Sequence, residues 1–102
     1  MSTAPSIVPH GDEGDTYLVL DDFGGLGRCW RETDADGADR QTLIRDFVEG
    51  QYRYPVRIVA FNTAEGWSRD VTKEIAEELR RRSYEFGKLP KATLDFIEAN
   101  RR

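Results

Sequence analysis

The stretch 55–70 constrains the fold of this chain more than any other part of the sequence. It reads Pro-Val-Arg-Ile-Val-Ala-Phe followed by Asn-Thr-Ala-Glu-Gly-Trp-Ser-Arg-Asp. Apolar residues occupy both alternating sets of positions over 56–61, which is typical of a strand that is central or covered on both sides. Proline is tolerated at the start of a strand. The polar residues after Phe61 predict a tight loop that leads into the longest helix, and we expect Ile58 to lie in the core.

Upstream of this stretch, the sequence predicts a hairpin and a helix. The β-prone runs 16–21 and 28–33 are separated by three glycines in four positions, which favours a short reversal. The only cysteine, Cys29, is expected to be a half-buried residue of the second strand. A helix is predicted over 38–49 from apolar residues at helical spacing: Leu43, Ile44, Phe47 and Val48.

Downstream of it, two helices are predicted. The longer one runs over about 68–86, with Ser68 or Asp70 as its N-cap and Ile75 in its apolar stripe. Pro90 indicates the start of a short last helix. Its inward residues are expected to be Leu94 and Ile97, with Phe96 beside them.

The order of these elements is β-β-α-β-α-α, which predicts an α+β fold. A small three-stranded, mainly antiparallel sheet would have the spatial order 2-1-3, with the helices packed on one face. Residues 16–102 would form a single domain, and 1–15 a flexible N-terminal tail. Since the strands are apolar on both faces, part of the sheet should stay near the surface, and we expect that part to come from Tyr17, Val19, Trp30, Val59 and Phe61.

Composition excludes several classes of protein. One cysteine and one histidine in 102 residues leave no internal disulfide, no multi-cysteine or His-rich metal site and no His-centred catalytic triad. We therefore expect no catalytic residues, no metal and no cofactor. The sequence also has no apolar run that is long enough to span a membrane, and it has no secretion signal. A cytoplasmic protein is the expectation.

The net charge of −4 is unevenly distributed along the chain. Residues 1–65 hold 6 basic and 12 acidic residues, a net of −6, whereas 66–102 hold 9 and 7, a net of +2. The run Arg80, Arg81 and Arg82 is the candidate nucleic-acid-binding site in the basic half. Glu77 and Glu78 precede these arginines at the i, i+4 spacing of helical ion pairs, which favours a solvated, salt-bridged helix face instead.

The loop 62–70 holds the best candidate for a ligand-binding site. It combines amide, hydroxyl, carboxylate, indole and guanidinium groups between the end of a strand and the start of a helix, where free backbone amides favour an anion. The same residue types are ordinary turn formers and helix caps. The candidate ligand-binding residues are Asn62, Thr63, Glu65, Trp67, Ser68, Arg69 and Asp70.

The segment 55–71 resembles short uncharacterised bacterial proteins of proteobacterial type, and the resemblance extends over roughly 16–86. No activity is attached to those proteins. The resemblance therefore implies a bacterial cytosolic origin and assigns no role to any residue.

Three functions follow from these observations. The first is a non-enzymatic protein-interaction or regulatory module that works as a homodimer or with another protein. The second is a small-molecule or anion binder, conceivably an enzyme, that uses the loop 62–70. The third is a nucleic-acid-associated regulator that uses the arginines 80–82, which the acidic net charge disfavours. An apolar open sheet face would favour the first of these.

Overall fold

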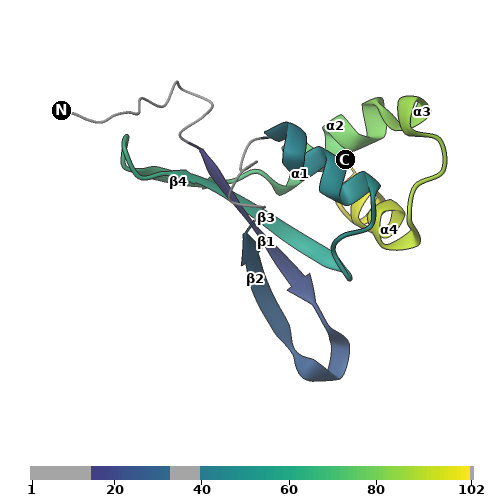
Figure 1. Ribbon diagram of the computed structural model, residues 1–102, viewed down its shortest axis with the longest axis horizontal. Coiled ribbons are helices and arrows are strands. Elements are labelled where there is room, and N and C mark those ends of the chain that lie inside the picture. The colour runs from purple at the N-terminus through teal and green to yellow at the C-terminus, as the bar shows by residue number, and fades with distance from the viewer. Residues whose placement is uncertain (1–14, 33–39, 102) are drawn as a thin grey trace.

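The structure is a computed structural model that describes residues 15–32 and 40–101 (Figure 1). The predicted tail, except for Asp15, and the expected strand residue Thr33 lie outside the described residues. The elements in chain order are β1 (Thr16–Asp22), a 3₁₀ turn (Gly24–Leu26), β2 (Arg28–Glu32), α1 (Arg40–Val48), β3 (Pro55–Asn62), β4 (Trp67–Asp70), α2 (Thr72–Arg81), α3 (Ser83–Phe86) and α4 (Lys91–Ala99).

The sheet is antiparallel and has the strand order β2-β1-β3-β4. The predicted α+β class and the order 2-1-3 are confirmed. The prediction of three strands is wrong, because β4 forms a hairpin with β3 where a loop and a helix start were expected. Gly66 turns the chain back with a φ of 75°, a conformation that glycine adopts without steric cost. Its amide donates to the Asn62 carbonyl oxygen at 2.8 Å, and this bond closes the reversal.

The helices cover one face of the sheet, and the residues of β1 alternate between that face and the other (Figure 1). Tyr17, Val19 and Asp21 point to the helices and are buried, at 6%, 0% and 0% exposure. The expectation that Tyr17 and Val19 stay near the surface is therefore wrong. Their neighbours Leu18 and Leu20 lie on the opposite face and are only partly buried.

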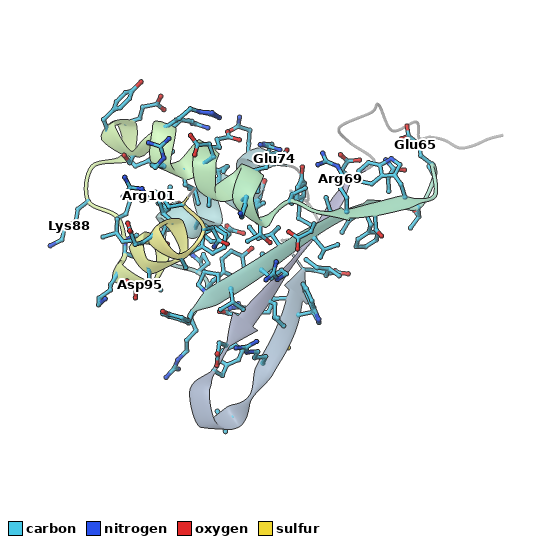
Figure 2. The ribbon with its side chains drawn as sticks, turned by 180° about the vertical axis from the view of Figure 1, so that it is seen from behind. Glu65, Arg69, Glu74, Lys88, Asp95 and Arg101 are labelled. Carbon is cyan, nitrogen blue, oxygen red and sulfur yellow. The ribbon has the colours of Figure 1, made fainter. Side chains whose placement is uncertain are left out.

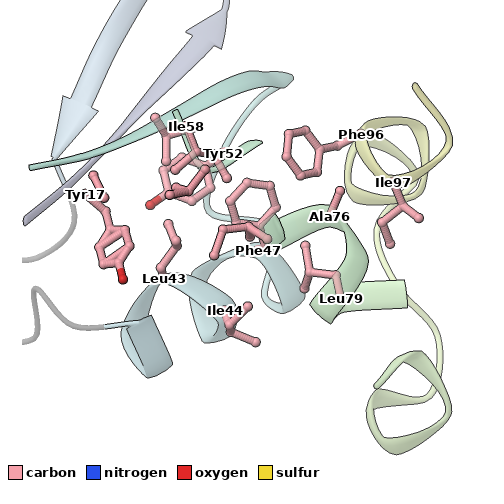
Figure 3. Packing of buried hydrophobic residues seen from close by; sticks show 14 of the residues in the cluster. Tyr17, Leu43, Ile44, Phe47, Tyr52, Ile58, Ala76, Leu79, Phe96 and Ile97 are labelled. Carbon is pink, nitrogen blue, oxygen red and sulfur yellow. The ribbon is translucent and has the colours of Figure 1, made fainter. Parts of the chain in front are cut away.

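The core lies between this face of the sheet and helices α1, α2 and α4 (Figure 3). The Phe47 ring packs between those of Tyr52 and Phe96, with ring centroids 5.0 and 4.9 Å away. Ile58 and Ile75 are fully buried, as predicted. The remaining buried apolar side chains are Tyr17, Val19, Leu43, Ile44, Ala60, Val71, Ala76, Leu79, Leu89 and Ile97.

The helix that was predicted over 68–86 is shorter and interrupted. Thr72, which is 1% exposed, accepts a hydrogen bond from the Ile58 amide through its hydroxyl and also donates to the Ile58 carbonyl. This side chain continues the pairing with β3 beyond the end of β4, so α2 begins only there. At the other end, Arg82 lies between α2 and the short helix α3.

The last helix is rotated relative to the prediction. The Thr93 hydroxyl donates to the Phe47 carbonyl at 2.7 Å, which fixes one side of α4 against α1. Phe96 and Ile97 consequently face the core, whereas Leu94 is 49% exposed, so the prediction that Leu94 points inward is wrong. None of the helices within 15–32 and 40–101 is long and apolar enough to cross a membrane.

Candidate functional site

The predicted ligand-binding residues lie on the β3–β4 hairpin, and most of their polar side chains form contacts that stabilise it. The Asn62 side chain, 3% exposed, donates through Nδ2 to Asp15 Oδ1 at 2.9 Å and accepts from the Glu65 amide through Oδ1 at 2.8 Å. An asparagine that satisfies a turn amide in this way holds a local reversal. Thr63 is exposed at the turn.

Glu65, Trp67 and Arg69 contact one another at the far end of the hairpin. The Trp67 indole Nε1 donates to Glu65 Oε1 at 2.8 Å, and the Arg69 guanidinium lies 5.8 Å from the centroid of the Trp67 ring. Arg69 also pairs with Glu74 of α2 at 3.0 Å. Figure 2 shows Glu65 and Arg69 well away from the α4 residue Asp95. These polar groups therefore bind each other.

Ser68 and Asp70 point to the other side of β4. Ser68 is exposed, and Asp70 accepts from Arg57 Nη1 at 2.9 Å and from the Thr72 amide at 2.8 Å. Partial burial alone would raise the pKa of Asp70, but the hydrogen bonds from Thr72 and Arg57 lower it on balance. Of the two predicted caps, Asp70 is the one whose carboxylate serves the start of α2.

The arginines at the end of α2 are largely neutralised by neighbouring glutamates. Arg80 pairs with Glu77, and Arg82 pairs with Glu78 at 3.2 Å and Glu85 at 3.1 Å. The expected Glu78–Arg82 pair is thus confirmed, while Glu77 bonds to Arg80 instead of Arg81. Arg81 is exposed. The predicted salt-bridged helix face describes this segment well.

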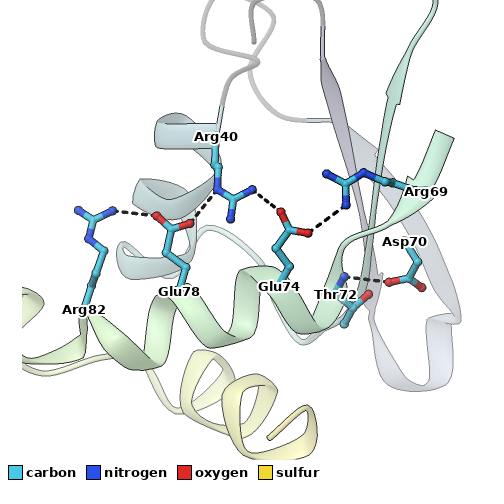
Figure 4. Close-up of polar contacts among 7 residues, drawn as sticks. All are labelled: Arg40, Arg69, Asp70, Thr72, Glu74, Glu78 and Arg82. Carbon is cyan, nitrogen blue, oxygen red and sulfur yellow. Dashed lines mark hydrogen bonds and ion pairs between the residues drawn. The ribbon is translucent and has the colours of Figure 1, made fainter. Parts of the chain in front are cut away.

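A chain of ion pairs that the sequence analysis did not predict joins α1, α2 and β4 (Figure 4). Arg40 binds Glu74 at 2.8 Å and Glu78 at 2.7 Å, and Arg69 and Arg82 extend the chain at its two ends. The hydrogen bond from Arg40 lowers the pKa of Glu74. Burial would raise the pKa of Glu78, but the bonds from Arg40 and Arg82 lower it on balance. These contacts hold elements together and leave little charge for a ligand.

Apolar side chains from three adjacent strands gather on the face of the sheet that is turned away from the helices, beside the polar residues Arg57, Ser68 and Asp70. Register places Leu20 opposite Trp30 and Leu18 opposite Val59 on this face. We call it the open face and define it by five side chains from three adjacent strands: Leu18, Leu20, Trp30, Val59 and Phe61. Trp30 is 46% exposed and the other four are partly buried.

The sequence analysis identified three of these five residues: Trp30, Val59 and Phe61. It missed Leu18 and Leu20 because β1 is apolar at both sets of alternating positions. Asp21 is the residue that decides which face of β1 turns to the helices. Its carboxylate is 0% exposed and accepts from Arg31 and from the amides of Arg53 and Tyr54. Those partners lie on the helical side, so Tyr17 and Val19 turn there with Asp21.

Within the described residues, no three histidine, cysteine, aspartate or glutamate side chains come together so as to hold a metal ion. Cys29 is exposed, contrary to the expectation that it is half-buried. Comparisons of this chain with protein-family models, with curated proteins and with solved structures find no significant match. Any proposal about function must therefore be based on the geometry of the chain itself.

Proposed function

We propose that this chain is a non-enzymatic protein-interaction module that associates with a second copy of itself at the β2 side of the open face. The observation that carries the proposal is the row of five apolar side chains there, with its most exposed member, Trp30, on an edge strand. Exposed apolar clusters on small soluble domains commonly mark interfaces. Two-fold pairing is the simplest closed arrangement in which identical chains cover such a surface.

The distribution of polar groups supports a protein partner over a small ligand or a nucleic acid. The side chains of 62–70 that carry charge bind each other or neighbouring elements. Two of the three arginines at 80–82 are paired with glutamates.

Sedimentation equilibrium at micromolar concentration tests the proposal. We expect a reversible dimer of twice the 11.7 kDa chain mass. Trp30→Ser should weaken the association about tenfold or more, because a tryptophan at the centre of an interface often contributes about 2 kcal/mol.

The matched control is Tyr84→Ser. Tyr84 is an aromatic residue on α3 that is 83% exposed and lies outside the open face. The Tyr84→Ser substitution should leave the association unchanged. A wild-type chain that sediments as a clean 11.7 kDa species over this concentration range would contradict the proposal.

A further inference from the structure

Within residues 15–32 and 40–101, the edge strand β2 lies at one end of the sheet order and pairs only with β1. Its other side has no partner strand in this part of the chain. Four of its five residues are exposed, and Figure 1 shows the β1–β2 hairpin reaching beyond the helices. An uncovered edge strand offers unpaired backbone groups to another strand.

The hydrogen bonds of β1 determine which β2 groups face outward. The Asp22 amide donates to the Tyr54 carbonyl at 3.0 Å, on the side of β1 that faces away from β2. Asp22 and its partner Arg28 are therefore a pair without mutual backbone hydrogen bonds. Since the pattern alternates, the N–H and C=O groups of Arg28, Trp30 and Glu32 all point to the free edge.

These directions restrict how two β2 strands can pair antiparallel about a two-fold axis. Outward groups must meet outward groups, so the axis passes through a residue and not between residues. Centring on Trp30 pairs all five residues, whereas centring on Cys29 or Arg31 pairs fewer. Centring on Arg31 would also bring two arginines of like charge together, which is unfavourable.

The side chains favour the arrangement about Trp30. It places Arg28 of each copy opposite Glu32 of the other, on the same face as the two indoles. The Arg28 side chain is 59% exposed, and its Nε lies 3.3 Å from Asp22. Among the residues that the structure describes, the Glu32 carboxylate has no hydrogen-bond or ion-pair partner. Charged residues on an edge strand often prevent pairing, but here opposite charges at 28 and 32 meet under the two-fold.

We propose that two copies of this chain join by antiparallel pairing of their β2 strands about Trp30, with reciprocal Arg28–Glu32 ion pairs. The two sheets then form one continuous sheet across the dimer, and the two Trp30 side chains meet at the centre of the joined open faces. Strand addition at a sheet edge combines backbone hydrogen bonds with side-chain selectivity. This inference rests on the proposed function, because it specifies the geometry of the same association.

Charge reversal at the two positions tests the register. In its homodimer, Arg28→Glu alone places a glutamate opposite Glu32 at both cross-strand positions, and Glu32→Arg alone places an arginine opposite Arg28 at both. Each variant should self-associate about tenfold more weakly than the wild type, since both cross-strand pairs change from attraction to repulsion. An equimolar mixture of the two variants pairs two glutamates of one chain with two arginines of the other. Both cross-strand pairs are then of opposite charge, so the mixture should form a heterodimer about as strongly as the wild type dimerises.

The double variant makes the same test within a single chain. Arg28→Glu combined with Glu32→Arg in one chain exchanges the two charges and restores both opposite-charge pairs in its homodimer. This double variant should dimerise about as strongly as the wild type, which sedimentation equilibrium measures.

The control is the variant pair Glu98→Arg and Arg101→Glu, which makes the same charge changes at the end of α4 and two residues after it. Glu98 and Arg101 are exposed and form their own ion pair at 3.3 Å, and Figure 2 shows Arg101 among the helices. Both control variants should dimerise like the wild type. Far-ultraviolet circular dichroism of each variant verifies that it is folded.

The possible outcomes separate the inference from the proposed function. Weak single variants, an associating double variant and unaffected controls support the register. Single variants that dimerise like the wild type overturn edge pairing but leave the interaction module intact, as does a folded double variant that stays monomeric. A monomeric wild type overturns the proposed function itself.

Discussion

Asp21 is a buried charge whose partners organise the start of β3. Its side chain is 0% exposed, and its carboxylate accepts from Arg31 Nη1 at 2.7 Å, the Arg53 amide at 2.8 Å and the Tyr54 amide at 2.6 Å. A buried carboxylate is tolerated only when it is paired and hydrogen-bonded in this way. One side chain thus joins β1, β2 and the segment before β3.

Asp21→Ala should lower the free energy of unfolding by about 2–4 kcal/mol, because it leaves two partly buried amides and a guanidinium without their acceptor. Urea denaturation at pH 7 measures the loss. Asp95→Ala, which removes only the surface pair with Lys91, should cost less than about 1 kcal/mol. Equal losses in the two variants would contradict the structural role of Asp21.

At the scale of residues, the sequence predicts well which side chains of an element are buried when its other face is polar. It predicts them poorly when both faces carry apolar side chains. Ile75 was identified because the charged residues around it leave few other apolar choices in its helix, and Ile58 was identified although both faces of its strand are apolar. Tyr17 was expected near the surface and is buried, because either Tyr17 or Leu18 could fill the core. The choice depends on Asp21, whose backbone partners lie more than thirty residues further along the chain. Similarly, Leu94 and Phe96 exchange roles because Thr93 bonds to α1.

At the scale of elements, β4 was predicted as a loop and helix start because its residues suit both. Ser68 and Asp70 are common helix caps. The strand forms because Asn62 and Gly66 close a hairpin that brings Trp67 opposite Asn62. The order of the other predicted elements follows from periodicity, which is a local property of the sequence. Hairpin closure depends on bonds between side chains and turn amides, which periodicity does not reveal.

The ion-pair chain centred on Arg40 makes the packing of α1 on α2 sensitive to acid. The folded state lowers the pKa values of Glu74 and Glu78 below the ordinary value of 4.5. A lowered carboxyl pKa contributes stability above pH 4.5, and this contribution is lost as the pH falls from 4.5 through the folded-state values. Acid should therefore weaken the link between the helices through these two side chains.

Arg40→Gln should lower the free energy of unfolding by about 1–2 kcal/mol at pH 7, a value reduced because the pairs are partly exposed to solvent. The difference from the wild type should shrink at pH 3, which lies below the ordinary carboxyl pKa of 4.5, because part of the contribution from Glu74 and Glu78 is then lost. Urea denaturation at the two pH values measures it. Arg81→Gln, at an exposed position, should change stability by less than about 0.5 kcal/mol. A difference in the free energy of unfolding that is as large at pH 3 as at pH 7 would mean that Arg40 acts by packing and not by charge.

At the scale of the whole molecule, the net charge of −4 sets how the chain meets polyanions. Arg80, Arg81 and Arg82 can neutralise at most about three phosphates, and Glu77, Glu78 and Glu85 compete for two of these arginines. Any binding of DNA should therefore be weak, independent of sequence and only shallowly dependent on salt.

Fluorescence anisotropy with a short labelled duplex at several salt concentrations measures this. The slope of log affinity against log salt should be no steeper than about −3. A control variant with Lys73, Lys88 and Lys91 changed to alanine should behave like one with the three arginines changed. Tight binding at physiological salt that disappears only in the arginine variant would instead favour a nucleic-acid-associated regulator.

The central position of β1 has a consequence for the order in which the chain can fold. β1 pairs on one side with β2, the next strand in sequence, and on the other with β3, which is separated from it by the whole of α1. During synthesis the hairpin can close early, but the second side of β1 must wait until Pro55–Asn62 has left the ribosome. Such non-local pairing is slow. Until it happens, Tyr17 and Val19 lack their β3 neighbours Ala60 and Ile58, and a nascent chain at that stage is a natural client for chaperones.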